Sequence, residues 1–499
     1  MTLRELLRGL TAEPVAAVPI RGLVCHSKQV RPGDVFVAIQ GESMDGHTYI
    51  DEAITRGASA VVAGHLPVRY GAATREGSQW RTCPCVTVSD TRRALAVMAA
   101  RFYGHPTEKL RLLGITGTNG KTTTTYLLKS VLEQTGGGVG MLGTIVYQIG
   151  SRVLPSMNTT PGPLDLQRYC AQMVGEGLEW CVMEVSSHAL AQARTEGLTF
   201  EVGLFTNLGS DHLDYHRTRA EYGAAKRRLF EHVREGGYAV VNVDDPFGRT
   251  LAQTIPNRRI VTFGVRGPAD VTVRGLGYSW RGLSCSLMTP WGIIPISTPM
   301  LGRHNAWNIA AATAAAVALG IGPETVQQGL AALADVPGRL ERVPNDLGLN
   351  ILIDYAHTAD ALQLVLDSIR ELTSGRVIVV FGCGGDRDRQ KRAEMGRIAG
   401  LLADHVILTS DNPRSEDPLA IIREIEAGFP RAFREYQILA DREQAISSAL
   451  YLAHPEDTVL IAGKGHETYQ IFGNISVPFV DRDVVQRWLA AQHHAAVAS

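Results

Sequence analysis

A glycine-rich turn between an apolar strand and an apolar-periodic helix is the feature that most constrains this chain. Residues 112–132 read LLGITGTNGKTTTTYLLKSVL. Glycines at 117 and 120 let backbone N–H groups curl toward phosphate oxygens, Lys121 supplies a positive charge, and the Thr122 hydroxyl can ligate Mg²⁺. The common pattern G-x-x-x-x-G-K-[ST] would place a glycine at 115, where Ile115 stands, so the motif is the shorter G-T-N-G-K-T. A chance turn is the competing interpretation, but the order of strand, turn and helix predicts a nucleoside triphosphate site.

Composition narrows the class of protein. A chain of 499 residues predicts about three domains, and its net charge of −1 gives no sign of a nucleic-acid-binding surface. Its seven cysteines are odd in number and scattered, which favours reduced thiols. The N-terminal segment MTLRELLRGL is charged and amphipathic, and no apolar run reaches bilayer length. We therefore expect a cytoplasmic protein with no membrane span and no nucleic-acid partner.

The order of apolar segments predicts an α/β fold class with three domains. Residues 1–107 contain two strand-like segments, at 35–39 and 60–64, and form a small α/β domain. In residues 108–336, apolar strands alternate with helical stretches, which predicts a mostly parallel sheet flanked by helices, and the alanine-rich segment 306–319 predicts a buried helix. A second alternation fills residues 337–499 and predicts a doubly wound, Rossmann-like domain.

Polar residues gather where two strands of the central domain are expected to end. Glu184-Val185-Ser186-Ser187-His188 follows one strand, and residues 207–216, NLGSDHLDYH, follow another. Ligands of open α/β sheets bind at such carboxyl ends, so a carboxylate and an imidazole here could hold a metal beside phosphates. A cap or turn role is the alternative for each residue alone. By itself Lys226, in YGAAKRRLF, is typical of a solvated helix lysine.

An ordered set of motifs then carries a resemblance over essentially the whole chain. The chain reads GTNGKTTT, EVSSHAL, NLGSDHLDYH, Tyr222 to Lys226 to Phe230, GRHNAWNIAAA, DVPGRLE, DYAHTADAL and DNPRSEDP in this order. In this it resembles the Mur ligase family. The resemblance implies a UDP-binding domain, a central ATPase domain and a C-terminal amino-acid-binding domain. It also implies an ATP-dependent ligase that adds the third residue of the peptidoglycan stem peptide, with ATP and Mg²⁺ required.

The resemblance further implies the chemistry. The γ-phosphate of ATP would pass to the D-glutamyl side-chain carboxylate, and an incoming amine would attack the resulting acyl phosphate. Mg²⁺ and Lys121 would offset the repulsion between the anionic groups. The catalytic residues implied are Lys121, Glu184, His212 and Lys226. The metal ligands implied are Thr122, Glu184, His212 and Lys226, the last as a CO₂-derived carbamate.

For ATP, the resemblance implies contacts on both sides of the expected boundary between the central and C-terminal domains. Asn305 and Asn308 lie three residues apart and would share a helix face, although Asn305 is also suited to cap the alanine-rich helix. Arg339 suits phosphate, and Asp354 matches a ribose contact, so domain closure would complete the site and exclude water. The full expected set is Gly117, Thr118, Asn119, Gly120, Lys121, Thr122, Thr123, Asn305, Arg339 and Asp354.

The UDP-sugar dipeptide is expected to use a separate set of residues. Matching positions are Ser27, Asn158, Thr159, Thr160, Ser186, Gln192 and Arg194, together with the segment Glu42-Ser43-Met44 before Asp45-Gly46-His47. The family commonly reads Asp-Ser-Arg where this chain has His26-Ser27-Lys28. A plain turn role for Ser27 therefore stays open.

The motif Asp411-Asn412-Pro413-Arg414 indicates the amino acid that is added. Arginine presents a planar fork suited to a carboxylate, and meso-diaminopimelate offers a distal carboxylate that lysine lacks. A simple turn is the alternative for this motif, and GKG near 464 is a weak glycine loop. The implied contacts are Arg387, Asp411, Asn412, Pro413, Arg414, Gly463 and Glu467.

Other functions stay open at this point. Within amide ligases, the chain could add lysine or D-Ala-D-Ala, or polyglutamylate folate. A different class is a nucleotide-gated binding protein that hydrolyses ATP without forming a product. We expect small-molecule partners only and a monomer.

Overall fold

The computed structural model describes residues 1–41, 44–66, 83–209 and 211–498. The chain divides into two compact units, and each is described by itself. The first unit holds residues 1–121, 136–241 and 246–261. The second unit holds residues 122–135, 242–245 and 262–499. Within the described residues, no helix combines the length and the apolar character needed to cross a bilayer.

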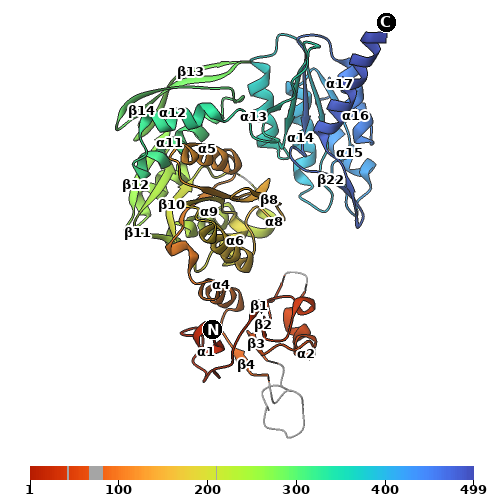
Figure 1. Ribbon diagram of the computed structural model, residues 1–499. Helices are drawn as coiled ribbons and strands as arrows, with labels where there is room; N and C mark the ends of the chain where they lie inside the picture. The colour runs from red at the N-terminus through yellow and green to blue at the C-terminus, as the bar shows by residue number, and fades with distance from the viewer. Residues whose placement is uncertain (42–43, 67–82, 210, 499) are drawn as a thin grey trace. The chain divides into compact units, whose positions relative to one another are not determined.

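The first unit begins with a small parallel sheet in the order β1-β2-β3-β4 (Figure 1). Its strands are β1 (Gly22–Val24), β2 (Asp34–Val37), β3 (Ala60–Ala63) and β4 (Cys85–Thr87). Successive side chains of a strand point to opposite faces. Val35 and Val37 therefore pack toward α1 (Leu3–Leu6) and α4 (Thr91–Phe102), while Phe36 packs toward α2 (Ile50–Thr55). Both predicted strands of this region are confirmed.

The rest of the first unit is built on a larger sheet whose centre is parallel. The strand order is β11-β10-β5-β9-β6-β7-β8. The bounds are β5 (Arg111–Thr116), β6 (Val139–Leu142), β7 (Val146–Ile149), β8 (Arg152–Pro155), β9 (Trp180–Glu184), β10 (Phe200–Phe205) and β11 (Val233–Asn242). β5 lies between β9 and β10, with Leu113 opposite both Val182 and Val202. The predicted parallel strands are confirmed, but β6, β7 and β8 pair antiparallel, which the sequence did not indicate.

Helices of the first unit lie between these strands along the chain. They are α6 (Pro163–Gly175), α7 (Ser187–Ala191), α8 (Leu213–His216), α9 (Arg219–Arg227) and α10 (Pro246–Thr254), with short 3₁₀ turns at Ser27–Gln29, Gly46–Tyr49, Pro106–Glu108 and Arg228–His232. Buried apolar residues of strands and helices form one central core, including Cys170, Met173, Met183 and Phe205. This core fixes the loops at the carboxyl ends of β5, β9 and β10.

One part of the second unit combines an antiparallel meander with three of its helices. The meander is formed by β13 (Val271–Ser279), β14 (Gly282–Thr289) and β15 (Gly292–Thr298), and β12 (Arg259–Gly264) pairs parallel with β13 (Figure 1). The helices are α5 (Lys121–Glu133), α11 (Asn305–Leu319) and α12 (Pro323–Ala332). α11 is the alanine-rich helix predicted from the sequence, and it is buried along most of its length. On α5, the Ser130 hydroxyl donates to Gly329 O on α12 at 2.7 Å.

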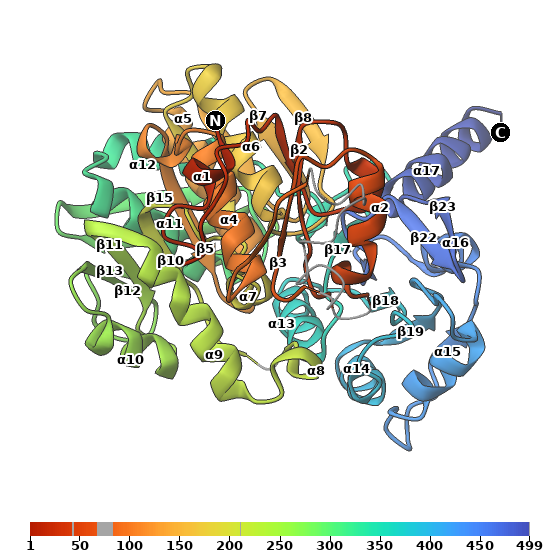
Figure 2. The ribbon, with the colours of Figure 1, turned by 90° about the horizontal axis from the view of Figure 1, so that it is seen from below.

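A six-stranded sheet completes the second unit in the order β16-β17-β21-β18-β19-β20. The strands are β16 (Glu341–Arg342), β17 (Asn350–Asp354), β18 (Val377–Phe381), β19 (His405–Leu408), β20 (Tyr436–Ile438) and β21 (Thr458–Ala462), all parallel to their neighbours except β16. One face packs on α13 (Ala359–Arg370), α14 (Gln390–Leu402) and α15 (Pro418–Glu426). The other packs on α16 (Arg442–Leu452) and α17 (Asp481–Ala498), as Figure 2 shows. A hairpin of β22 (Tyr469–Phe472) and β23 (Ile475–Pro478) follows β21.

Candidate functional site

The glycine-rich turn follows β5 and is held by the segment after β10. Thr118 N donates to Asn207 O at 2.9 Å, and Asn119 N donates to Asn207 Oδ1 at 3.0 Å. Gly117 has φ of +151°, and a Cβ there would lie 1.8 Å from Thr206 Oγ1. Only glycine fits this approach, and the turn is fixed at the end of a central strand, where an α/β sheet binds ligands.

Lys121 lies over this turn. Its Nζ donates to Gly117 O at 3.0 Å and to Thr118 O at 2.8 Å. Gly120 has φ of +85°, a backbone conformation that glycine adopts without strain. The ammonium is thus kept beside the backbone N–H groups of the turn, which is the arrangement that binds phosphate oxygens.

Lys226 is 1% exposed, so the solvated-lysine interpretation is wrong. It projects from α9 and donates from Nζ to Gly117 O at 2.7 Å. Burial holds the pKa of Lys226 well below its usual value, and the charge of Lys121 lowers that pKa further. The Nζ lies 4.2 Å from the ring centroid of Tyr222, whose hydroxyl forms a 3.2 Å hydrogen bond with Thr118 Oγ1. Tyr222 therefore joins α9 to the nucleotide turn.

Glu184 is the last residue of β9 and is 1% exposed. Its carboxylate accepts hydrogen bonds from Thr144 N at 2.7 Å and from Thr144 Oγ1 at 2.9 Å. The cap interpretation is wrong for Glu184, since Ser186 caps α7 by accepting from Ala189 N. The sequence analysis did not identify Thr144, although it follows a central strand just as the named polar residues do.

His212 belongs to a group of aromatic side chains near α9. Its ring centroid lies 4.7 Å from that of His188 and 6.3 Å from that of Tyr222, and His212 has φ of +55°. Mg²⁺ prefers oxygen ligands, so the Glu184 carboxylate and the Thr122 hydroxyl fit this ion better than an imidazole does.

Most of the residues expected to contact the dipeptide belong to one hydrogen-bonded group, namely Thr159, Thr160, Ser186, Gln192 and Arg194. Thr160 Oγ1 donates to Glu184 O at 2.9 Å and accepts from Ser186 N at 2.9 Å. Arg194 Nη1 donates to Thr160 O at 3.0 Å, and Arg194 Nη2 donates to Gln192 Oε1 at 2.6 Å. A 3.1 Å hydrogen bond joins the Thr159 and Thr144 hydroxyl groups, and Asn158 O accepts from Tyr147. The structure thus brings the dipeptide residues of the central region next to Glu184.

In the N-terminal region, Ser27 is buried and its hydroxyl donates to Glu52 Oε2 at 2.7 Å. Ser27 begins a short 3₁₀ turn, and the His26 side chain caps that turn by accepting from Lys28 N at 3.3 Å. Of the expected segment, Glu42 and Ser43 lie outside the described residues.

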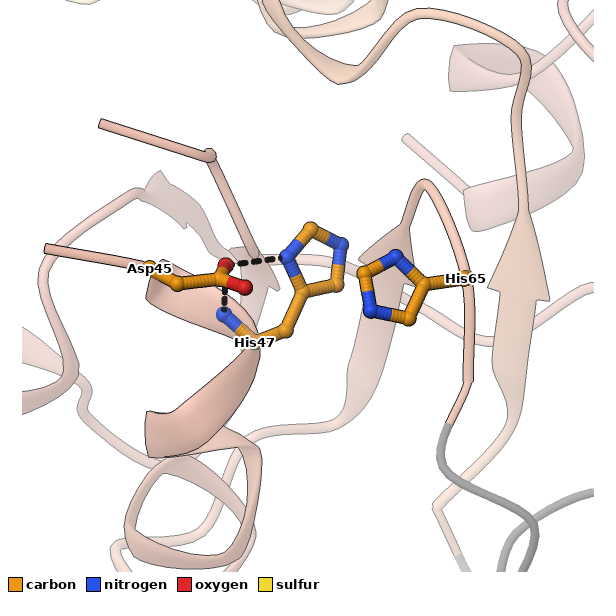
Figure 3. A group of neighbouring side chains, drawn as sticks. All are labelled: Asp45, His47 and His65. Carbon is orange, nitrogen blue, oxygen red and sulfur yellow. Dashed lines mark hydrogen bonds and ion pairs between the residues drawn. The ribbon is translucent and has the colours of Figure 1, made fainter. Parts of the chain in front are cut away.

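Asp45, His47 and His65 lie together in this region (Figure 3), with one ligand atom of each within 4.8 Å of the others. Both ring nitrogens of His47 are engaged, because Nε2 accepts from Gly64 N at 3.0 Å and Nδ1 lies 2.6 Å from Asp45 Oδ1. An accepting Nε2 carries no proton, so Nδ1 carries it and donates to Asp45. The group therefore fixes the loop and leaves His47 no nitrogen for a metal.

In the second unit, Asn305 and Asn308 share a face of α11 as expected. Asn308 Nδ2 donates to Asn305 Oδ1 at 2.8 Å, and Asn305 Nδ2 donates to Leu301 O at 2.5 Å. The capping role considered for Asn305 is wrong, because His304 is the N-cap residue and no side chain caps this helix. Thr124 Oγ1 on α5 also donates to Asn308 Oδ1, at 3.4 Å.

Arg339 and Asp354 are likewise brought together. Arg339 Nη2 donates to Thr122 Oγ1 at 3.2 Å, and its guanidinium lies 4.6 Å from the ring centroid of Tyr355. Asp354 accepts from Leu340 N at 2.6 Å and from Ala356 N at 2.7 Å. Burial raises the pKa of Asp354, and the nearby Arg339 offsets part of that rise.

The residues expected to bind the amino acid lie at the carboxyl ends of β18, β19 and β21. Asn412 Nδ2 donates to Glu467 Oε2 at 2.8 Å, and its Oδ1 accepts from Ile471 N at 3.0 Å. Lys464, which is 0% exposed, donates to the same Glu467 oxygen at 2.8 Å. The sequence analysis did not assign a role to Lys464, although its GKG segment was the available signal.

Arg414 is fixed on two sides. Its Nη1 donates to Gly385 O at 2.7 Å, and its backbone N donates to Ile471 O at 3.0 Å. Arg387 lies in the same loop as Gly385, is exposed, and donates to Asp386 O at 3.1 Å. Pro413 O accepts from Glu416 N at 3.1 Å. Gly463 has φ of +105°, and a Cβ there would lie 2.8 Å from Asp411 Oδ2.

Comparison with known proteins gives matches over nearly the whole chain. Three family models match: Mur ligase family, catalytic domain over residues 19–103, Mur ligase middle domain over 115–316, and Mur ligase, glutamate ligase domain over 338–465. The UDP-N-acetylmuramoyl-L-alanyl-D-glutamate--2,6-diaminopimelate ligase of Geobacter metallireducens is 45% identical, covering 97% of this chain and 98% of that protein. The ligase of the same name from Geobacillus kaustophilus is 43% identical with the same coverage, 97% and 98%. A solved structure of a ligase with this name has a TM-score of 0.69 and 31% identity, covering 99% of both chains.

Proposed function

The chain belongs to the Mur ligase family, and from this premise we infer that it joins meso-2,6-diaminopimelate to UDP-N-acetylmuramoyl-L-alanyl-D-glutamate. It is an ATP-dependent ligase of peptidoglycan synthesis. The observation that supports this choice of amino acid is the placement of Arg414 two residues after Asn412, where the Arg414 guanidinium donates to Gly385 O and Asn412 bonds Glu467. A carboxylate and an amide suit an ammonium group, and a fixed guanidinium suits a distal carboxylate.

The reaction needs activation because a carboxylate is a poor electrophile. We propose that the D-glutamyl side-chain carboxylate attacks the γ-phosphorus of ATP, the bond from that phosphorus to the β,γ-bridging oxygen breaks, and ADP leaves. The amine of diaminopimelate then attacks the acyl carbon, loses a proton, and expels inorganic phosphate as the amide forms. Lys121 stabilises the negative charge that moves between the phosphates and the carboxylate.

The metal assignment rests on the donors present. Thr122 and Glu184 would hold Mg²⁺, with His212 and a carbamate on Lys226 as further ligands, and bound Mg²⁺ would supply positive charge beside the phosphates. The lowered pKa of Lys226 supports carbamylation, because only a neutral amine reacts with CO₂. The carbamate would replace a buried cation with an anion that has two oxygen donors.

The remaining residues are assigned by substrate. For ATP they are Gly117, Thr118, Asn119, Gly120, Thr123, Asn305, Arg339 and Asp354, in addition to Lys121 and Thr122. For the UDP-linked dipeptide they are Ser27, Asn158, Thr159, Thr160, Ser186, Gln192 and Arg194, of which Ser27 has the weakest support because its hydroxyl already bonds Glu52. For diaminopimelate they are Arg387, Asp411, Asn412, Pro413, Arg414, Gly463 and Glu467.

A substrate panel tests this function. The enzyme is given ATP, Mg²⁺, bicarbonate, UDP-N-acetylmuramoyl-L-alanyl-D-glutamate and one of diaminopimelate, L-lysine or D-Ala-D-Ala, and both phosphate and product mass are measured. We expect phosphate release to require the dipeptide and diaminopimelate together. Release without any amino acid, and without a longer peptide, would instead identify a nucleotide-gated binding protein.

We also propose that the three domains span residues 1–107, 108–336 and 337–499. The protein would act in the cytoplasm and as a monomer. Light scattering on the purified protein tests the last of these.

A further inference from the structure

Arg392 is a large charged side chain that the proposed reaction does not use. It lies near the start of α14, and its side chain is 0% exposed. A charge so deeply buried requires partners, because isolated burial costs several kcal/mol. Its partners connect two loops that follow β18 and β19.

The first partner is Glu416, which comes two residues after Arg414. Arg392 Nη1 donates to Glu416 Oε2 at 2.8 Å, and Arg392 Nη2 donates to Glu416 Oε1 at 2.8 Å. This is the bidentate geometry in which arginine binds a carboxylate with most directional control. Arg392 Nη2 also donates to Gly384 O at 3.2 Å, so one guanidinium holds both loops.

Glu416 is a second point of connection. Its Oε1 accepts from Asp386 N at 2.6 Å. The Asp386 carboxylate in turn accepts from Ser415 Oγ at 2.6 Å and from Ser415 N at 3.2 Å. Asp386, in the loop carrying Arg387, is therefore bonded to both Ser415 and Glu416 in the loop carrying Arg414.

These hydrogen bonds maintain two residues in an unfavourable backbone conformation. Asp386 has φ of +53° and Arg414 has φ of +52°, both in the left-handed region that residues with a Cβ adopt at a cost. Asp386 directly precedes Arg387 of the proposed acceptor site, and Arg414 is the other arginine of that site. The contacts to Glu416 and Gly385 hold these conformations in place.

We propose that the Arg392–Glu416 ion pair is a positioning device that sets the spacing of the Arg387 and Arg414 guanidinium groups, and so the selection of an acceptor with a distal carboxylate. This rests on the proposed function. Arg392 is too deeply buried to contact a substrate, so it acts through the loops. The pair is a specificity determinant for the amino acid and leaves the nucleotide and UDP-dipeptide contacts unchanged.

Glu416→Gln is the primary test. Glutamine keeps the size and an oxygen that can accept from Asp386 N, but it lacks the charge that holds Arg392 in bidentate geometry. Arg392→Lys tests the other partner, because lysine keeps the charge and loses the fork. Thermal melting establishes that each variant is folded, and Glu416→Gln keeps the test valid if Arg392→Lys does not fold.

Glu424→Gln is the matched control. Glu424 lies on α15 and accepts from the same guanidinium, from Arg392 Nη1 at 2.9 Å, and also from Arg389 Nε at 3.3 Å. The same chemical change is therefore made on the same arginine. Steady-state kinetics are measured for all three substrates, and kcat/KM for diaminopimelate is divided by kcat/KM for L-lysine to give a selectivity ratio.

For Glu416→Gln we expect the KM for diaminopimelate to rise about tenfold and the selectivity ratio to fall about tenfold, with the KM values for ATP and the UDP-dipeptide within about twofold. For Glu424→Gln the ratio should stay within about twofold. The inference is overturned if the selectivity ratio of Glu416→Gln is unchanged, or if the ratio falls equally in Glu424→Gln. It is also overturned if the KM values of Glu416→Gln for all three substrates rise in parallel. If the parent enzyme adds no diaminopimelate, the proposed function fails first, and this inference fails with it.

Discussion

The Lys226 amine lies where a positive charge is costly. It is 1% exposed, and its environment lowers its pKa well below the usual value of 10.5. A permanent ammonium at this position would be desolvated and repelled by Lys121, and the Asp211 carboxylate offsets only part of that cost. A side chain that becomes an anion on reaction with CO₂ removes this conflict.

Lys226→Ala should lower kcat by at least about 100-fold, because a group that stabilises transferred charge would be lost. Adding acetate or formate should restore part of the activity, since these supply carboxylate oxygens in the space left. With ¹³C-bicarbonate, the parent should give a carbamate ¹³C signal that the variant lacks. The exposed Lys109→Ala serves as control, and activity within a few-fold of the parent in Lys226→Ala would refute the role.

Glu416 makes a pH-dependent contribution to stability. The hydrogen bonds from Arg392 lower the pKa of Glu416 from 4.5 to about 2. A carboxyl with a lowered pKa in the folded state contributes its full stabilisation when the pH is above its pKa in the unfolded state. That contribution is lost as the pH falls through its pKa in the folded state. Glu416→Gln should therefore reduce the free energy of unfolding by about 1–2 kcal/mol at pH 7, after allowance for solvent screening.

The measurement is urea denaturation of parent and variant between pH 7 and pH 2. The difference between them should be constant above about pH 4.5 and shrink toward zero as pH approaches 2. A difference that grew on acidification would contradict the assigned direction of the pKa shift.

At the scale of helices and strands, close packing fixes the helix that follows the nucleotide turn in sequence. α5 follows this turn directly and packs on α12 in the second unit. A Cβ on Gly329 would lie 2.4 Å from the Cα of Val131. The close approach of the two helices therefore depends on the absence of one side chain.

Gly329→Ala should destabilise the protein by about 2 kcal/mol, because a backbone contact must open to admit the methyl group. Gly175→Ala, at the end of α6, is the matched control, because nothing lies within 4 Å of a Cβ there. The control should be neutral or slightly stabilising. Thermal denaturation of both variants gives the comparison, and equal melting temperatures would show that the α5–α12 contact can adjust.

A second element-scale link joins α9 to the nucleotide turn through Tyr222. Tyr222→Phe removes only the hydroxyl that bonds Thr118. One such hydrogen bond is worth about 1 kcal/mol, so the KM for ATP should rise about three- to tenfold. Tyr451→Phe, on a tyrosine that is 67% exposed, is the control. An unchanged KM for ATP would mean that the turn keeps its shape without this contact.

Sequence periodicity identified the buried parallel strands of both sheets, because strands covered on both faces read as continuous apolar runs. It did not identify β7, β8 or the β13–β15 meander. These strands are partly exposed. In some of them buried and exposed residues alternate, and in β8 most residues face solvent. Their pairing depends on turns and on neighbours more than on apolar content.

At the scale of the whole molecule, the motifs needed for chemistry could be read because each is local. Within the nucleotide turn, within the DNPR motif and within the segment after β9, the residues of each motif lie a few positions apart. The contacts that organise them are not local. Asn412 and Glu467 bond across 55 positions, and Thr144 reaches Glu184 across 40. No periodicity or propensity encodes such pairs. The contacts of Thr144, Lys464 and Arg392 were therefore identified only from the structure.

The proposed reaction requires ATP to convert the peptide carboxylate into an acyl phosphate before the amine attacks. The most direct measurement uses a dipeptide substrate with ¹⁸O in both oxygens of the D-glutamyl side-chain carboxylate, and analyses the released phosphate by mass spectrometry. Each released phosphate should carry one ¹⁸O atom, and the amide product should keep the other. Phosphate without ¹⁸O, formed while the peptide lengthens, would contradict it.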